Sequence, residues 1–321
     1  MPSIVTHYLF AKDVFEALPK KIKTSFQNQK KTYLLFSQSF DNLFYYKFLT
    51  PFLGNSIRKL GISAQKEKTD TYFLNIISYM KDKHLDTNEE IRAYLFGSIT
   101  HYVLDYHCHP YVFYYTDDAN LNLRYRGLHE KMEVNIDAYM LQKKNGKNLN
   151  DANLASTLLP KLTFSKDLKE LINIVFEETF KVNQMGRKYE EASRTGQFLL
   201  KYFVTDKKGY KKKLYRLKDT LTFFSKRRYE YLSFHVTQIN TDYLNLKHEV
   251  WYNPWSKKKS TASFEDLYAK ALLKAVEIIT VLDKYFKEEI SLNEMKKTLK
   301  DYSYITGLSW QDKRKPSLFK I

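Results

Sequence analysis

The sequence predicts an all-α protein, folded as a compact bundle of many helices. Only 9 glycines and 7 prolines occur among 321 residues, and a β-sandwich or β-barrel of this length needs many more such turn residues. Hydrophobic residues make up 43% of the chain, enough for a large core, and many recur at helical spacing. The 26 tyrosines and 22 phenylalanines indicate a core rich in aromatic rings.

Apolar residues at helical spacing place individual helices along the chain. We expect helices around residues 10–18, 72–80, 128–140, 168–182 and 197–204. Another should follow Ser263, because Ser263 and Asp266 have the spacing of a capping box ahead of an apolar stripe over 267–286. Residues 239–261 are polar and contain Pro254, so we expect an ordered loop there.

One further helix is expected to carry a group of histidines. Thr87 is its predicted N-cap, because Glu89 and Glu90 would then lie in the first turn, where the helix dipole favours acidic residues. We expect this helix to end near Pro110, since proline lacks the amide N–H and its ring clashes with the preceding turn.

Positive charge is concentrated between residues 201 and 230, which contain eleven Lys or Arg and three Asp or Glu. Leu214, Leu217, Leu221 and Phe224 recur at helical spacing there and predict a helix with a basic face. The whole chain has a formal charge of +17, which composition alone can produce but which also attracts polyanions. The segment from Lys201 to Arg228 is therefore either a solvated helix face or a contact for an anionic membrane surface or nucleic acid.

Four of the eight histidines fall between residues 101 and 129, next to acidic residues. His101 and Asp105 are four residues apart, so on a helix they share a face and can bind one ion. His129 and Glu133 repeat this spacing. His109 is rotated from His101 by about 80°, at about 100° per residue, and is better placed for a second ion. Imidazole and carboxylate ligands suit Zn²⁺, and a single cysteine excludes a thiolate-rich site.

The residues from 93 to 133 have a distinctive order: Gly97, His101, Asp105, His109-Pro110 and then His129-x3-Glu133. In this order they resemble the core of the bacterial zinc-dependent phospholipase C family. Segments elsewhere are also similar to that family, and together they extend the resemblance over nearly the whole chain: Met1-Pro2-x4-His7, Asp41-x2-Phe44-Tyr45, Leu244-Asn245-x2-His248-x2-Trp251 and Thr306-Gly307-Leu308.

The resemblance implies a helical enzyme with up to three zinc ions in one cleft between helices. Carried over by position, the metal ligands would be His7, Asp41, His101, Asp105, His109, His129 and Glu133. Asp41, His101 and Asp105 would bind one ion, and Asp105 would bridge to a second ion at His7, with the N-terminal amine as a further candidate ligand. The three remaining residues would bind the third ion.

One ligand position departs from the family pattern. The family usually has a further histidine in a His-x3-Thr pattern, whereas this chain has Gln65-x3-Thr69. The carbonyl oxygen of glutamine is a weaker and harder ligand than imidazole. We therefore expect Gln65 to be at most a weak ligand, so that the first site binds its ion loosely, prefers another ion or stays empty.

The resemblance implies hydrolysis of a phosphodiester by metal-activated water, with a phospholipid as the favoured substrate. The ions would neutralise charge on the phosphate and lower the pKa of a bound water, while Asp41 would accept a proton. Two alternatives stay open. One is a metal-dependent nuclease or other phosphoesterase with the same three-zinc layout, for which the basic charge would suit nucleic acid. The other is a metal-stabilised binding module with little activity.

Residues 1–200 form the predicted metal-binding region, and residues 201–321 a helical extension packed on it within one structural unit. No run of 18 apolar residues occurs, so no transmembrane helix is expected. Residues 1–18 lack an apolar stretch of secretory type, and the single Cys108 fits a reducing compartment. From these features we expect a cytoplasmic protein.

Overall fold

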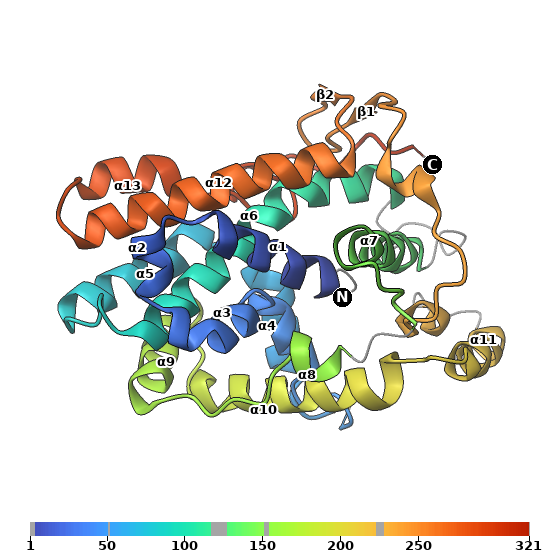
Figure 1. The fold of residues 1–321 in the computed structure, drawn as a ribbon, viewed down its shortest axis with the longest axis horizontal. Helices are drawn as coiled ribbons and strands as arrows, with labels where there is room; N and C mark the ends of the chain where they lie inside the picture. Colours follow the sequence, from blue (N-terminus) through green and yellow to red (C-terminus); the bar gives the residue numbers. More distant parts are fainter. Residues whose placement is uncertain (1–3, 51, 117–126, 151–153, 223–227, 321) are drawn as a thin grey trace.

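The computed structural model describes residues 4–50, 52–116, 127–150, 154–222 and 228–320, and these are largely helical (Figure 1). In this part of the chain the strands are β1 (Trp251–Tyr252) and β2 (Lys259–Ser260), which pair antiparallel as one short ribbon. The predicted all-α class is therefore confirmed.

The α-helices, in chain order, are α1 (Ile4–Ala17), α2 (Lys20–Thr24), α3 (Lys30–Phe36), α4 (Asn55–Ala64), α5 (Thr69–Asp82), α6 (Glu89–Thr116), α7 (Leu128–Asn145), α8 (Ala155–Leu158), α9 (Lys166–Phe180), α10 (Met185–Leu199), α11 (Tyr210–Leu221), α12 (Phe264–Phe286) and α13 (Leu292–Leu299). Shorter helical turns connect them: η1 (Gln27–Gln29), η2 (Ser39–Tyr45), the π-helical η4 (Leu200–Val204), η5 (Tyr229–Leu232) and η6 (Thr241–Leu244).

Helix α6 runs through the middle of the molecule. Helices α3 and α12 pack along it, and α1 and α7 contact it as well (Figure 1). Every residue from Ile91 to Tyr106 is buried, as expected for a helix surrounded by others. Gly97 allows the close approach of α3, because a Cβ there would overlap the carbonyl oxygen of Tyr33 and lie 3.0 Å from Cβ of Phe36.

The predicted end of this helix near Pro110 is wrong, since α6 continues to Thr116. Proline removes the N–H that would bond the carbonyl of Tyr106, four residues earlier. Gly307 packs closely there, and a Cβ on it would lie 2.5 Å from the Tyr106 oxygen. Beyond the proline, Tyr111 is fully buried against Trp251, with ring centroids 5.3 Å apart. These tertiary contacts support the helix past a residue that would end it in isolation.

The N-cap of α6 is also corrected, by one residue. The Oδ1 atom of Asn88 accepts hydrogen bonds from the backbone N–H groups of Glu90 (3.0 Å) and Ile91 (3.1 Å). Asn88, not Thr87, therefore satisfies the free amides of the first turn. The predicted segment 197–204 likewise covers only the end of a longer element, because α10 begins at Met185.

The predicted capping box of α12 is confirmed, with Ser263 and Asp266 bonded reciprocally. The apolar stripe of this helix is buried as expected, at Leu267, Ala271, Ala275, Ile278, Leu282 and Phe286. A buried ion pair between Arg92 and Asp283 joins α6 to α12. The proposed division of the chain near residue 200 stays a prediction.

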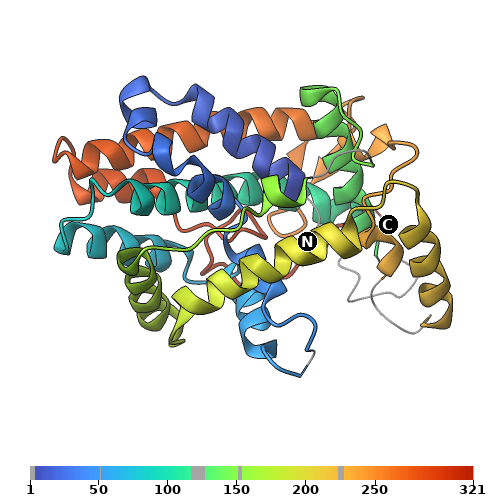
Figure 2. The ribbon, with the colours of Figure 1, turned by 60° about the horizontal axis from the view of Figure 1, so that its bottom comes forward.

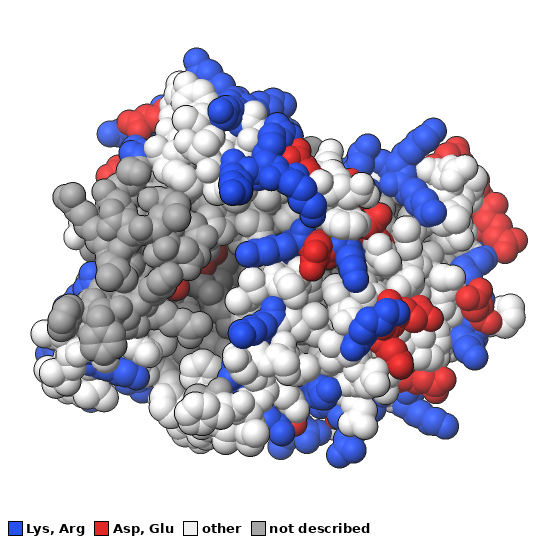
Figure 3. Space-filling view, turned by 180° about the vertical axis from the view of Figure 1, so that it is seen from behind, with Lys and Arg blue, Asp and Glu red and all other residues white. Residues whose placement is uncertain are grey.

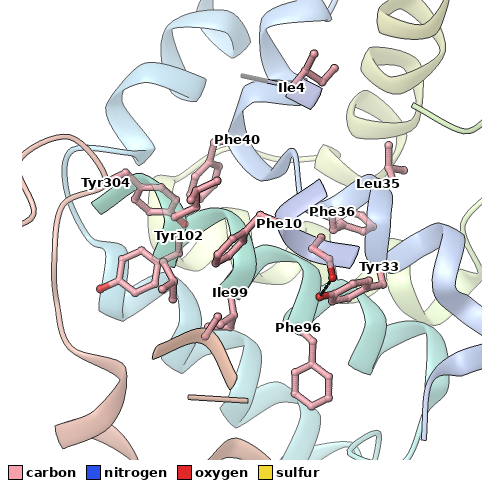
Figure 4. Close-up of a cluster of buried hydrophobic side chains, with 14 of the residues drawn as sticks. Ile4, Phe10, Tyr33, Leu35, Phe36, Phe40, Phe96, Ile99, Tyr102 and Tyr304 are labelled. Carbon is pink, nitrogen blue, oxygen red and sulfur yellow. Dashed lines mark hydrogen bonds between the residues drawn. The ribbon is translucent and has the colours of Figure 1, made fainter. Parts of the chain in front are cut away.

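Aromatic side chains fill much of the core, as the composition predicted. Figure 4 shows Phe10, Phe36, Phe40 and Tyr304 among buried residues from several helices. The hydroxyl of the fully buried Tyr33 donates to the backbone carbonyl of Ala11 at 2.8 Å, so this phenol is satisfied without water.

Helix α11 lies at one edge of the molecule (Figure 1). Its predicted apolar stripe does not pack on the core: Leu214, Leu217 and Leu221 are 62%, 59% and 71% exposed. Phe224 lies outside the described residues. Across the ranges that the structure describes, no helix combines the length and the apolar character needed to cross a bilayer.

Candidate metal centre

Five of the seven predicted ligands line one cavity of about 140 Å³, and the other two, His101 and Asp105, contact His7 beside it. The seven ligands come from separate elements: His7 from α1, Asp41 from η2, three residues from α6 and two from α7. The cavity is lined by His7, Asp41, Phe44, Ile62, Gln65, His109, Phe113, His129, Glu133 and Ile305. Polar ligand atoms thus face a space whose remaining wall is mostly apolar.

The first compact group consists of His7, His101 and Asp105, all buried. The Nε2 atom of His7 lies 3.1 Å from Oδ1 of Asp105, and Nε2 of His101 lies 3.1 Å from Oδ2 of the same carboxylate. The two imidazole rings are stacked, with centroids 4.2 Å apart. The carboxylate of Asp105 therefore faces two imidazoles: His101 from α6, and His7 from α1, which lies almost a hundred residues earlier in the chain.

The second compact group consists of His109, His129 and Glu133. The Oε1 atom of Glu133 lies 3.1 Å from Nε2 of His129 and 3.9 Å from Nε2 of His109. The two groups adjoin, because Nδ1 of His109 lies 3.8 Å from Oδ2 of Asp105. The structure thus divides six of the predicted ligands into two neighbouring sets of three.

Asp41 and Gln65 face the same cavity but belong to neither set. The side-chain amide of Gln65 donates a hydrogen bond of 2.6 Å to Oδ1 of Asp41. Its N–H group, not its carbonyl oxygen, therefore faces the carboxylate. The backbone carbonyl of Gln65 is held as well, by the N–H of Tyr304 at 3.0 Å. The candidate ligand at the N-terminal amine falls in residues 1–3, outside the described residues.

Comparison with known protein families bears on these two groups. A model of the zinc-dependent phospholipase C family matches residues 6–216, well over half of the chain. The chain belongs to this family. The matched region begins just before His7 and includes every predicted ligand. No match to the chain was found among curated proteins or among solved structures.

The zinc implied by the family fits both groups of ligands. Tetrahedral zinc with ligands at about 2.0–2.1 Å places neighbouring ligand atoms about 3.3 Å apart, close to the 3.1 Å separations found here. Nε2 of His101 and Oδ2 of Asp105 are buried and lack a hydrogen-bond partner, although they lie 3.1 Å from each other. Oε2 of Glu133 is buried and unpartnered too. Burying such atoms is costly, and a shared cation would satisfy them.

Hydrogen bonds on the far side of two of the imidazoles favour the tautomer that zinc requires. Nδ1 of His101 lies 3.0 Å from the carbonyl of Ser37, and Nδ1 of His109 lies 2.9 Å from the carbonyl of Tyr304. A carbonyl only accepts, so each Nδ1 carries the proton and each Nε2 is left to bind metal.

Three of the contacts that orient these histidines were not predicted. Ser37 and Tyr304 act through backbone carbonyls, which no residue pattern reveals. Thr116 is the third: its Oγ1 donates to the carbonyl of Val112 at 2.8 Å and lies 3.3 Å from Nδ1 of His129. Its placement on α6 depends on the helix continuing past Pro110, which the sequence argued against.

Asp137 is a further residue that the sequence analysis missed. Its carboxylate accepts hydrogen bonds from the N–H groups of Val5 (3.2 Å) and Thr6 (2.8 Å) and from the Thr6 hydroxyl (2.6 Å). It therefore anchors the first turn of α1 next to His7. Burial raises the pKa of Asp137 to about 7, although the bonds from Thr6 and Val5 oppose this. The sequence signal that could have found Asp137 is its spacing of four residues from Glu133, which places both carboxylates on one face of the helix.

The surrounding imidazoles keep the two ligand carboxylates ionised. Burial raises the pKa of Asp105, but His109 and His101 outweigh that effect and hold this pKa well below its ordinary range. Burial also raises the pKa of Glu133, and His129 outweighs it, lowering the value to about 2. Both residues are therefore anionic at neutral pH, the state in which carboxylates bind a divalent cation.

Proposed function

We propose that this member of the zinc-dependent phospholipase C family hydrolyses the phosphodiester bond of a phospholipid, with zinc held by the two groups of ligands. The observation that carries the proposal is the presence of two compact groups of imidazole and carboxylate ligands, which adjoin where His109 lies 3.8 Å from Asp105. Two such groups so close together suit two adjacent metal ions. Family membership supports a metal-dependent phosphodiesterase, while the phospholipid substrate is the finer part of the proposal.

Zinc at these ligands would polarise the phosphate and lower the pKa of a water molecule toward neutrality. Asp41 is the proposed proton acceptor, since it faces the cavity and Gln65 leaves its second carboxylate oxygen available. A bond forms between the water oxygen and phosphorus as the bond from phosphorus to the diacylglycerol oxygen breaks. The water proton passes to Asp41, the departing oxygen takes up a proton from bulk water, and Asp41 returns its proton to bulk water.

The size of the cavity supports entry of the phosphate group alone. Its volume of about 140 Å³ is well below the roughly 300–1,000 Å³ of sites that enclose a drug-sized ligand. The acyl chains would therefore remain outside. Phe44, Phe113, Ile62 and Ile305 provide an apolar wall that limits water and suits the glycerol end of a lipid.

The experiment combines metal counting with an activity assay. We expect about two zinc equivalents in the wild type by elemental mass spectrometry, with less zinc in His101→Ala and in His129→Ala. Asp41→Asn should retain the zinc but lose most phosphodiesterase activity. Less than half an equivalent in the wild type, not restored by added Zn²⁺ or Mn²⁺, would overturn the proposal. Activity on single-stranded nucleic acid but not on lipid would favour the nuclease alternative.

One observation favours the alternative of a binding module with little activity. The amide of Gln65 donates a hydrogen bond of 2.6 Å to Asp41, the proposed proton acceptor. This bond must persist or rearrange when substrate enters. Full zinc occupancy without hydrolysis of any phosphodiester would support that alternative.

The segment from Lys201 to Arg228 remains a proposed contact for anionic membranes. The exposed leucines of α11 support it, since they lie on the same helix as Lys211, Lys213 and Lys218. Neutralising these three lysines with Gln should weaken binding to anionic vesicles and leave binding to neutral vesicles unchanged.

A further inference from the structure

Large apolar side chains are exposed together on the connection between η2 and α4. Phe48, Leu49, Phe52 and Leu53, here called the apolar loop, are 44%, 57%, 96% and 58% exposed. Figure 2 shows this connection projecting from the lower edge of the molecule as it leads into α4. Single exposed apolar residues are common, but four on one projecting connection indicate a surface that binds something.

The loop is held in this form by hydrogen bonds. One guanidinium nitrogen of Arg58 donates to the carbonyls of Tyr46 (2.9 Å), Lys47 (3.1 Å) and Leu53 (3.0 Å). Gly54, with φ of 79°, turns the chain into α4, and a Cβ there would lie 2.8 Å from the Tyr46 ring. The backbone at residues 46, 47 and 53 is thus tied down, while the four apolar side chains stay exposed.

The loop is joined to the metal cavity by one helix. Helix α4 follows it, and Ile62 on that helix lines the cavity while being 48% exposed. The neighbouring Gly61 packs on Phe44, another cavity residue, so that a Cβ there would lie 3.1 Å from the ring. One short helix, α4, therefore connects the apolar loop to the wall of the cavity.

The charges beside the loop complement an anionic surface. Residues 47–68 contain five basic residues and one acidic residue, Glu67. Lys59 and Lys66 are exposed, close in sequence to Ile62. Lys and Arg side chains are also spread over the face of the molecule shown in Figure 3. Apolar residues that insert and basic residues that contact headgroups are the pattern of interfacial membrane binding.

We propose that the apolar loop inserts into the surface of a phospholipid bilayer containing anionic lipid, and so brings a headgroup to the adjacent metal cavity. The delivery of a headgroup rests on the proposed function, whereas binding of the loop to the membrane does not depend on hydrolysis. A bilayer suits the loop better than a protein partner does, because a narrow projection penetrates lipid but offers little area for a folded surface. Because the cavity is too small for the acyl chains, they must stay in the membrane while the headgroup enters the cavity.

The test uses the zinc-loaded full chain and vesicles of phosphatidylglycerol and phosphatidylcholine in equal amounts. The variant Phe48→Ser/Phe52→Ser should bind these vesicles at least about tenfold more weakly in a sedimentation assay. Leu273→Ser is the matched control, because Leu273 is 74% exposed on α12, outside the loop, and its variant should bind within about twofold of the wild type. Thermal denaturation checks that each variant is folded.

Hydrolysis separates the two proposals. For the double variant, the ratio of vesicle hydrolysis to hydrolysis of a water-soluble phosphodiester should fall about tenfold. Unchanged vesicle binding by a folded double variant would overturn the loop proposal and leave the proposed function standing. A wild-type dimer that the double variant converts to a monomer, with vesicle binding unaffected, would also overturn it and assign the loop to self-association. Loop-dependent vesicle binding without hydrolysis of any phosphodiester would support the loop and refute the proposed function.

Discussion

At the scale of single residues, the distinctive feature of this centre is the pair formed by Gln65 and Asp41. The amide donates to the carboxylate at 2.6 Å, at the position where the resemblance led us to expect an imidazole. An amide N–H cannot bind a cation, so the pair occupies the place of a metal contact without supplying a ligand. We propose that this pair takes the place of the third site that the resemblance implied, beside the two compact groups of candidate ligands found among the described residues.

Restoring the imidazole should therefore restore a metal site. We expect Gln65→His to bind about one zinc equivalent more than the wild type, because imidazole and the freed Asp41 can share an ion. Elemental mass spectrometry of the purified proteins measures this. Gln65→Leu is the control, as it frees Asp41 without adding a ligand and should show no gain. An unchanged metal count in Gln65→His would mean that the pair does not replace a site.

At the scale of secondary structure, α6 carries much of the organisation of the protein. It presents three of the ligands at four-residue intervals, His101, Asp105 and His109. The same helix is buried on all sides from residue 91 to 106, so His101 and Asp105 cannot shift without disturbing the core. Its neighbours are fixed by close contacts at Gly97 and by the ion pair between Arg92 and Asp283.

The contact at Gly97 predicts a strong effect of a small change. Gly97→Ala should destabilise the protein by about 1–3 kcal/mol, because the added methyl group would overlap the Tyr33 carbonyl and force α3 away from α6. Urea denaturation followed by circular dichroism gives the change in the free energy of unfolding. Leu273→Ala, at an exposed site on α12, should change it by less than about 0.5 kcal/mol. Equal effects of the two substitutions would contradict the close packing.

The ion pair between α6 and α12 gives a second prediction at this scale. Arg92→Leu should lower the free energy of unfolding by about 3 kcal/mol, since it leaves the buried Asp283 with only Lys287 as a cationic partner. Adding Asp283→Leu should recover part of the loss, because no buried charge then remains at the contact. A double variant less stable than Arg92→Leu would argue against this interpretation.

At the scale of the whole molecule, the metal centre joins parts of the chain that are distant in sequence. Its two groups of ligands come from α1, α6 and α7. Metal bound at these candidate ligands would crosslink the first helix to the centre of the bundle, so metal and fold should stabilise one another. Asp137 of α7 contributes to the same junction by binding the first turn of α1.

Removal of zinc should therefore lower the melting temperature. A ligand at about 100 times its Kd adds about 2.7 kcal/mol to stability, which corresponds to several degrees in a chain of this size. Differential scanning fluorimetry before and after chelation measures the shift, and added zinc should reverse it. The response of His101→Ala should be clearly smaller, because one group of ligands is incomplete. An identical response in that variant would place the stabilising metal elsewhere.

Local sequence patterns were enough to predict the helical class and the ligand pairs that lie within one helix. Helix geometry is local, so four-residue spacing alone places His101 beside Asp105 and His129 beside Glu133. The capping box at Ser263 was predictable for the same reason, since its hydrogen bonds span three residues.

Which of these pairs lie together, and which residues surround them, depends on tertiary packing. The contact of His7 with Asp105, and the carbonyl of Tyr304 behind His109, depend on packing between segments far apart in the chain. Packing also carried α6 past Pro110 and left the leucines of α11 and of the apolar loop exposed. Local patterns indicate which conformations a segment can adopt. Burial and long-range contacts, which sum over the whole chain, determine which of them it adopts in the folded protein.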